Sequence, residues 1–353
     1  MGSLYARKEP FRLKPFAGFR SLETCHCVTG SMRHIYEFHD HPISEDLLLG
    51  LGSGVGFVYW HMKGTAPILG GRANVGRPGE EGLEKAAGRR TGVVVESFHT
   101  GSTRKAERAL LDMMVAGEPM MIMLDMGFLP YFDLPEDFHF GGHAVVIAGY
   151  DAEKKQVLIA DRDGELYPVS LEDVAKARGS TFKPFPPRNQ WFTFDFSGKR
   201  PPRPEEVVQA IHEVAAGMLE PPITNLGVKG IRKAAKQVLE WPEIVDKERL
   251  RWWCFNAFIF IDATGGTGGG IFRYMYGRFL KEAASITGES RLADMGDAMQ
   301  SIGDRWQEVA QIFKQASEAA SQVTTLPHAA KRMQAIADQE QAAWGTLRGI
   351  VGH

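Results

Sequence analysis

The chain has 353 residues, a length that predicts about two domains of ordinary size. Its 41 Lys and Arg residues nearly balance 43 Asp and Glu residues, so its charge points neither to nucleic acid nor to an anionic membrane surface as partner. No apolar stretch reaches the roughly 18 residues that cross a bilayer, and the first residues lack the apolar segment of a signal peptide. With only three cysteines, we expect a cytoplasmic protein without a disulfide framework, and homo-oligomerisation stays open.

The first part of the chain alternates helix and strand patterns. Apolar residues recur at helical spacing from Cys27 to about His39, and Thr24 is the expected N-cap of that helix. The later patterns predict a glycine turn entering an aromatic strand (50–60), a capped helix (102–119), a buried strand (120–125), a strand hairpin (141–151 and 156–163), a short helix (170–178) and a further strand (189–196).

A Pro-rich and charged segment, residues 197–206, separates these elements from a remainder in which almost every pattern is helical. We therefore predict an α+β fold with two domains. Residues 1–199 are expected to form the catalytic domain, and residues 200–353 a predominantly helical domain that caps or supports its active site.

Two cysteines, Cys25 and Cys27, stand next to each other in "TCHCV", just before and at the start of the first predicted helix. Zinc would need two more ligands at the usual spacing, and the remaining Cys254 lies in another apolar helix, so no metal site is expected. A C-x-x-C redox pair is absent as well. Two interpretations remain, a nucleophile or a small buried core residue.

A cysteine in the first turn of a helix faces unpaired N–H groups and the positive end of the helix dipole, and both favour the thiolate. A nucleophile also needs a base and a group that orients the base. "GGHAVVIAGYD" places His143 at the start of a strand, and "VLIADRD" places Asp161 at the end of the next. Hairpin pairing brings both to the same edge, so Cys27, His143 and Asp161 are a candidate triad, although a structural His and a turn-forming Asp are the plainer interpretation of each alone.

Several stretches resemble a known family, the N-terminal domain of butirosin biosynthesis protein H and its relatives. They are "HCVTGSMRHIYEFHDHPISEDLLLGLGSGVGFVYW" (26–60), "LGGR" (69–72), "LDMGFLPYF" (124–132), "GGHAVVIAGYD" (141–151) and "VLIADRD" (157–163). The helical remainder, with "GGTGGGIFRYMYGRFLKEAA" (265–284), resembles the uncharacterised domain that often follows it.

The resemblance implies a fold similar to papain-like and peptidase C39-like enzymes. It also implies an acyltransferase that moves an aminoacyl group from an acyl carrier protein thioester to an amine. By resemblance Cys27 is the nucleophile, and His143 and Asp161 complete the triad. The glutamine that commonly precedes the cysteine of such peptidases is absent, and Ser21 stands there. The Cys27 N–H is then one expected oxyanion donor, and His26 is a further candidate.

Other residues are candidates for substrate binding. Arg72, Asp125 and Tyr131 lie in the family-like stretches, and Arg273 follows the glycine loop 265–270 at the start of a predicted helix. That loop resembles an anion site, so the phosphate of a carrier-bound phosphopantetheine is a candidate ligand, while a plain interhelical hinge is the alternative. Structural ion pairs are the alternative interpretation for Arg72 and Asp125. No permanently bound cofactor is expected.

Three functions stay open from the sequence. The first is a cysteine acyltransferase of specialised metabolism that takes an acyl group from a carrier-protein or CoA-type thioester and delivers it to an amine. The second is a papain-like hydrolase that cuts an amide or peptide. The third is a binding protein on the same scaffold with a silent triad. The donor, acceptor and pathway do not follow from the fold.

Overall fold

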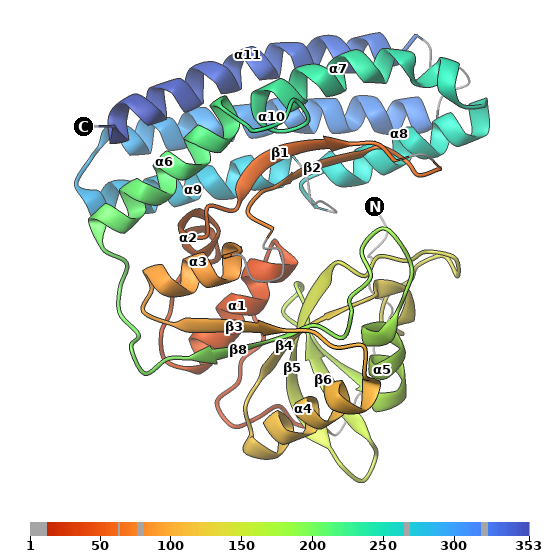
Figure 1. The fold of residues 1–353 in the computed structure, drawn as a ribbon, viewed down its shortest axis with the longest axis vertical. Coiled ribbons are helices and arrows are strands. Elements are labelled where there is room, and N and C mark those ends of the chain that lie inside the picture. Colours follow the sequence, from red (N-terminus) through yellow and green to blue (C-terminus); the bar gives the residue numbers. More distant parts are fainter. Residues whose placement is uncertain (1–12, 63, 76–80, 265–268, 319–323, 353) are drawn as a thin grey trace. The chain divides into compact units, whose positions relative to one another are not determined.

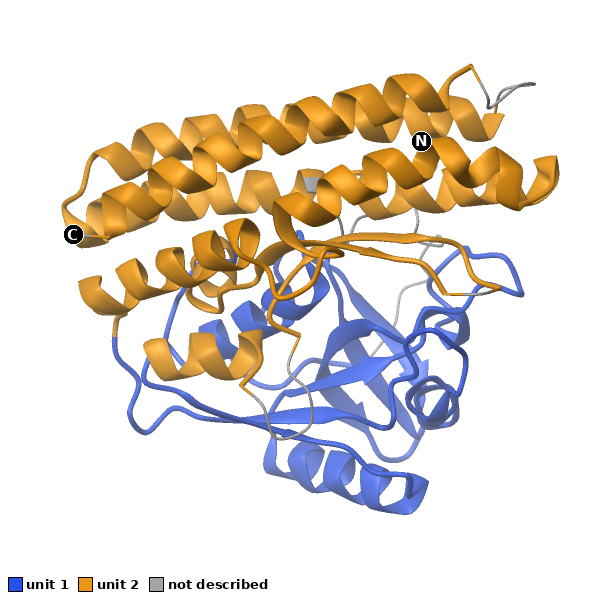
Figure 2. Ribbon diagram, turned by 45° about the horizontal axis from the view of Figure 1, so that its top comes forward, with its two compact units in different colours: residues 1–45, 91–200 blue, residues 46–90, 201–353 orange. Residues whose placement is uncertain are grey.

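The computed structural model describes residues 13–62, 64–75, 81–264, 269–318 and 324–352. The chain forms two compact units, unit 1 from residues 1–45 and 91–200 and unit 2 from residues 46–90 and 201–353 (Figure 2). The expected α+β fold is confirmed, since strands occur only up to Asp195 and the described elements after it are all helices. The units differ from the division expected at residue 200, because residues 46–90 group with the C-terminal helices.

Unit 1 is built on a six-stranded antiparallel sheet with the order β3-β8-β4-β5-β6-β7 (Figure 1). Its strands are β3 (Val94–Phe98), β4 (Met120–Leu124), β5 (His143–Asp151), β6 (Gln156–Ala160), β7 (Leu166–Ser170) and β8 (Trp191–Asp195). The predicted buried strand and hairpin are β4 and the β5–β6 pair. Strand β3 and strand β7 had no clear pattern in the sequence, because β3 is mostly exposed and β7 contains Pro168.

Helices cover both faces of this sheet. They are α1 (Cys27–Phe38), α4 (Thr103–Ala116) and α5 (Leu171–Gly179), with a 3-10 turn at η1 (Met126–Phe128). Val145 and Ile147 of β5 belong to the apolar cluster that includes residues of α4 and α5, while α1 packs against β4 and β5. Because neighbouring residues of a strand point to opposite faces, burial on both sides explains why β5 is apolar almost throughout.

Unit 2 contains the two-stranded antiparallel hairpin of β1 (Val55–Trp60) and β2 (Ile68–Arg72). Its helices are α2 (Glu45–Leu51), of which Glu45 is assigned to unit 1, α3 (Leu83–Arg90), α6 (Pro204–Leu219), α7 (Gly227–Ile244), α8 (Lys247–Ile261), α9 (Gly269–Thr287), α10 (Arg291–Glu318) and α11 (Leu326–Val351). Strand β1 packs on α7, and β2 packs on α8. This packing is what joins the hairpin to the helices that follow residue 200.

None of the helices in the described ranges is long and apolar enough to cross a membrane.

Candidate active site

Cys27 is the first residue of α1, as the helical spacing predicts. The predicted cap is wrong, because His26 and not Thr24 occupies the N-cap position, with its Nδ1 3.5 Å from the Thr29 N and 3.0 Å from the Thr29 hydroxyl. Thr24 lies two residues too early, and its backbone N–H instead donates to the Arg162 carbonyl at 2.7 Å. The N–H groups of the first helical turn have no acceptor inside the helix, so Cys27 begins at the positive helix end.

A buried carboxylate that sequence reasoning missed holds the turn before Cys27. Glu45 accepts the backbone N–H of Cys25 at 2.9 Å, that of His26 at 2.6 Å, and the Thr29 hydroxyl at 3.1 Å. Only 5% of Glu45 is exposed, so these bonds satisfy a charge that would otherwise be costly to bury. The sequence gives no local signal for this contact, since Glu45 stands 18 residues after Cys27 at the start of another helix.

Strand register places the candidate base and its orienting carboxylate on one face. In the hairpin, Val146 pairs with Ala160, so continuing the register by one residue places Asp161 opposite Val145. His143 lies two residues from Val145 and therefore shares its face. The His143 Nε2 and the Asp161 Oδ2 are 2.8 Å apart, and both side chains are almost completely buried. The predicted pairing of His143 with Asp161 is therefore present in the geometry.

Gly141, two residues before His143, is needed for packing. A Cβ on Gly141 would lie 2.3 Å from the Phe185 carbonyl oxygen and 2.6 Å from Pro187 Cδ. Any larger residue there would push apart two backbone segments and displace the entry into β5.

The segment before α1 is attached to the residues that follow β6. Glu23 and Asp163 form an isolated antiparallel bridge, and the adjacent Thr24 N–H donates to the Arg162 carbonyl. The Arg162 guanidinium also donates from Nη1 to the Cys25 carbonyl at 3.3 Å. These contacts bring the start of α1 to the edge where Asp161 and His143 lie.

The thiol and the imidazole form a coupled pair. Burial by itself raises the pKa of Cys27, but a hydrogen bond and charge from His143, the Ala144 N–H and the Arg162 charge lower the pKa of this thiol below its usual value. Burial lowers the pKa of His143, yet Asp161 and the Cys27 sulfur outweigh it and raise that pKa to about 9. The two shifts run in the direction that favours a thiolate–imidazolium pair. Because Nε2 bonds Asp161, Nδ1 is the ring nitrogen left for the thiol.

Asp161 is held as a carboxylate by three donors. Burial raises the pKa of Asp161, but the charge and hydrogen bond of His143, the Arg162 charge and the Tyr131 hydroxyl together lower it. The Tyr131 hydroxyl donates to Oδ2 at 2.9 Å, and the Arg162 N–H donates to Oδ1 at 2.8 Å. The ring of Tyr131 stacks on Tyr167 with centroids 4.2 Å apart. Tyr131, expected to bind substrate, thus contacts the carboxylate of the candidate triad.

The remaining candidates in unit 1 bond to the chain itself. Asp125 is fully buried, and its carboxylate accepts hydrogen bonds from the Ser180 hydroxyl at 2.6 Å and from the backbone N–H groups of Gly127 and Phe140. One of its oxygens also lies 3.0 Å from His139 Nδ1. Ser21 donates its hydroxyl to the Glu165 carbonyl at 3.1 Å. His26 contacts Thr29 as described above. Substrate or oxyanion binding by Asp125 and His26 stays a prediction.

Two further candidates belong to unit 2. Arg72 forms an ion pair with Glu84 at 2.8 Å. Arg273 is fully buried, and its guanidinium bonds both carboxylate oxygens of Glu340, at 3.0 and 2.7 Å, and the Gly56 carbonyl at 2.7 Å. These partners occupy the guanidinium on three sides, which favours a structural role for Arg273. Residues 265–268 of the glycine loop lie outside the described residues.

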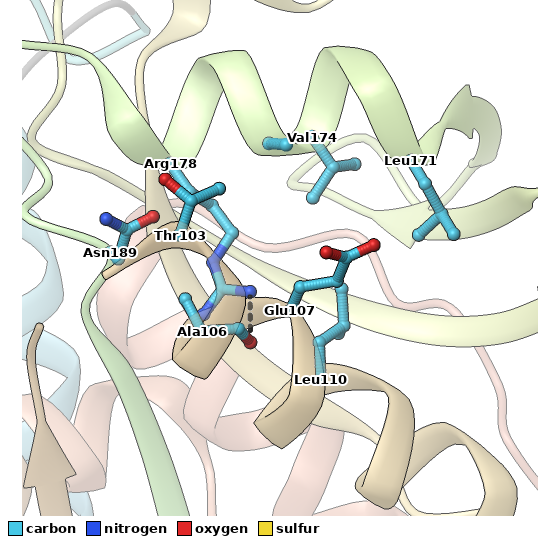
Figure 3. Close-up of a pocket in the computed structure, with 9 residues that line it drawn as sticks. Thr103, Ala106, Glu107, Leu110, Leu171, Val174, Arg178 and Asn189 are labelled. Carbon is cyan, nitrogen blue, oxygen red and sulfur yellow. Dashed lines mark hydrogen bonds between the residues drawn. The ribbon is translucent and has the colours of Figure 1, made fainter. Parts of the chain in front are cut away.

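A small hollow in unit 1 lies between α4 and α5 (Figure 3). Arg178 reaches into it and donates from Nη1 to the Ala106 carbonyl at 3.0 Å, while burial lowers its pKa to about 10. None of Cys27, His143 and Asp161 lines this hollow. Within the described part of the chain, no three His, Cys, Asp or Glu side chains form a group that could hold a metal ion.

Comparison with protein families agrees with the resemblance seen in the sequence. Residues 26–162 match the family described as "Butirosin biosynthesis protein H, N-terminal". This stretch is similar to that family over 137 residues of the chain. Residues 172–347 match a second family, described as "Domain of unknown function (DUF4872)". The comparison with curated proteins gives no match to the chain.

All three members of the candidate triad fall inside the butirosin biosynthesis protein H N-terminal match, whose last residue is Arg162. The DUF4872 match starts within α5 of unit 1 and ends within α11. The family takes its name from a butirosin biosynthesis protein, and that name is consistent with a biosynthetic role.

Proposed function

We propose that the protein is a cysteine acyltransferase that moves an acyl or aminoacyl group from a thioester to an amine. The observation that carries the proposal is the thiol of Cys27 at a helix N-terminus, coupled to a His143 imidazole that Asp161 holds at 2.8 Å. A structural cysteine packed in a core needs no such partner, as Cys254 illustrates, since burial alone raises the pKa of that thiol to about 12.

In the first half-reaction the Cys27 thiolate attacks the carbonyl carbon of the donor thioester. Negative charge develops on the carbonyl oxygen, and the N–H of Cys27 is the proposed donor to it, because helix geometry leaves this N–H without an internal acceptor. When the tetrahedral intermediate collapses, the donor's C–S bond breaks. The leaving thiolate takes the proton from the His143 imidazolium, and Cys27 is left as a thioester.

In the second half-reaction an amine attacks the acyl-thioenzyme. The neutral His143 accepts the proton of the incoming amine, the bond between the acyl carbon and the Cys27 sulfur breaks, and the amide product leaves. The Cys27 thiolate and the His143 imidazolium are then restored, so the cycle needs no other reactant. Asp161 stays ionised throughout and fixes the ring orientation, with the Tyr131 hydroxyl holding its carboxylate.

The proposed donor is an acyl group on the phosphopantetheine thiol of an acyl carrier protein or on a CoA-type thiol, and the proposed acceptor is an amine. A thioester suits this site because a thiolate exchanges with another thiol at little change in bond energy, whereas an amide donor demands protonation of a poor leaving group. The family's biosynthetic name is consistent with such a reaction.

The test is to incubate the full chain with a panel of acyl-pantetheine thioesters and to measure intact mass, followed by peptide mapping of all three cysteines. We expect a mass increment equal to the acyl group on Cys27, absent in Cys27→Ala. Cys25→Ala is the matched control, because Cys25 is the exposed neighbouring thiol and its loss should leave acylation in place.

Discharge of the acyl-enzyme separates transferase from hydrolase. Faster loss of the increment with a simple amine than in buffer, with formation of the amide, supports acyl transfer. Equal loss in both, with release of the free acid, identifies a hydrolase. Absence of acylation at Cys27 by every thioester, in a protein whose Cys27 still alkylates quickly, refutes the proposal.

A further inference from the structure

Arg178 is a buried guanidinium that the fold bonds only in part. It stands near the end of α5, and only 2% of it is exposed. Its Nη1 donates to the Ala106 carbonyl of α4 at 3.0 Å, whereas Nε and Nη2 are buried without a hydrogen-bond partner. Within the described part of the chain no carboxylate pairs with it, and burial lowers the pKa of the guanidinium to about 10. The group therefore keeps its charge at neutral pH, and that charge and two of its nitrogens are costly to bury as they stand.

The guanidinium lies at the hollow between α4 and α5. Its side chain reaches from α5 to the first turns of α4, beside Thr103 and Asn189 (Figure 3). The hollow has a volume of about 10 Å³, which is room for one water-sized occupant. Much of the remaining wall is apolar, formed by Ala106, Leu110, Leu171, Val174 and Ala175. Such a wall offers the guanidinium no acceptor, so a bound ligand is what can balance its charge there.

The start of α4 opens onto the same hollow. Thr103 is the first residue of this helix and lines the hollow. The Ser102 side chain accepts the Lys105 N–H, while the other N–H groups of the first turn have no acceptor inside the helix. The first turn also carries no acidic residue that would cancel the positive end of the helix dipole. A buried guanidinium and a helix N-terminus together form a donor set suited to an anion.

Glu107 is the competing partner for the Arg178 charge. It is the acidic residue that lines the hollow, and it is exposed. It does not bond Nε or Nη2 of Arg178, since both are without a partner. An exposed carboxylate would have to give up hydration to reach them. A variant of Glu107 therefore distinguishes pairing within the chain from binding of an anion.

We propose that the hollow between α4 and α5 binds one anion of the size of chloride, held by the Arg178 guanidinium and the first turn of α4. The volume of the hollow favours a monatomic anion over sulfate or phosphate. The bound anion joins α4 to the end of α5. That end also holds Asp125, whose N–H donates to the Ala177 carbonyl at 3.0 Å and whose carboxylate accepts the Ser180 hydroxyl. Anion binding therefore stabilises unit 1 where the chain leaves β4 toward β5.

The first test is thermal unfolding of the full chain at constant ionic strength, with sodium gluconate replaced stepwise by sodium chloride. Gluconate is too large for the hollow. We expect the melting temperature to rise by roughly 2–4 °C when chloride exceeds its dissociation constant about tenfold, because the ligand stabilises only the folded chain. Arg178→Met should abolish this rise. In gluconate this variant should melt no lower than the parent, because an apolar side chain replaces an unpaired buried charge.

Arg104→Met is the matched control. It is the same substitution in the first turn of α4, at an exposed side chain that does not line the hollow, and it should keep the chloride response. Glu107→Gln removes a negative charge beside the proposed anion and should keep or strengthen the response. A crystal of the parent soaked in sodium bromide locates the ion directly, and we expect an anomalous peak in contact with the Arg178 guanidinium.

A chloride response of equal size in the parent and in a folded Arg178→Met protein overturns the proposal, because it is then a general salt effect. Equal destabilisation by Arg178→Met and Glu107→Gln in both salts overturns it as well, because Glu107 is then the partner. Absence of bromide at Arg178 does the same, and this measurement needs no variant. None of these experiments involves an acyl donor or Cys27, so their outcome is independent of the proposed function.

Discussion

Replacing Asp161 by Asn tests whether the buried carboxylate sets the protonation of the whole site. Asp161 bonds His143 at 2.8 Å, and the pKa of His143 is raised to about 9 from an ordinary value of 6.5. Asp161 and Cys27 share this rise of roughly 2.5. If Asp161 supplies about half of it, its loss lowers the pKa of His143 by about one unit and weakens the imidazolium that keeps the pKa of the Cys27 thiol low. The alkylation rate of Cys27 on the acid side of its profile should fall about tenfold, and the rates should converge at high pH.

The assay is the pH profile of iodoacetamide alkylation at Cys27. Asp163→Asn is the matched control, because Asp163 lies two residues further along and accepts from Tyr167 and the Glu165 N–H rather than from His143. It should leave the midpoint where it is. A folded Asp161→Asn protein whose Cys27 alkylates at the parent's rate below pH 7 would refute the idea that Asp161 controls the protonation of Cys27 and His143.

Three further predictions concern stability. Glu45→Ala leaves the buried N–H groups before Cys27 without their acceptor, so we expect it to lower the free energy of unfolding by about 2–4 kcal/mol, measured by denaturant titration, with Glu45→Gln losing less. Glu340→Gln leaves the buried Arg273 charge unpaired and should cost about 3–5 kcal/mol by the same method, while replacing both residues by Met recovers most of the loss. Burial lowers the pKa of His34 from 6.5 to about 4. Between these two pH values His34 is therefore protonated in the unfolded chain but neutral in the folded chain. Stability should therefore fall by up to about 3 kcal/mol as pH drops from 6.5 to 4, and His34→Gln should flatten that part of the melting-temperature profile.

Much of unit 1 could be predicted because its signals are local. The cap and stop of α4, the Ser170 cap of α5 and the two apolar runs of the β5–β6 hairpin all occur within a few residues of the element that they define. The hairpin pattern also places His143 and Asp161 at the same edge of the sheet, because antiparallel pairing brings the start of the first strand next to the end of the second. Cys27 follows from helical periodicity alone, although its role does not.

The rest could not be predicted because it depends on contacts between distant segments. Glu45 reaches back to Cys25 and His26, and its own surroundings in the sequence indicate only the start of a helix. Thr24 has a good capping side chain, but its backbone N–H is hydrogen-bonded to the carbonyl of Arg162, 138 residues further on, and the helix begins later. Residues 46–90 gave no hint of joining the C-terminal helices, because a hairpin shows its own pairing but not the surface on which it packs.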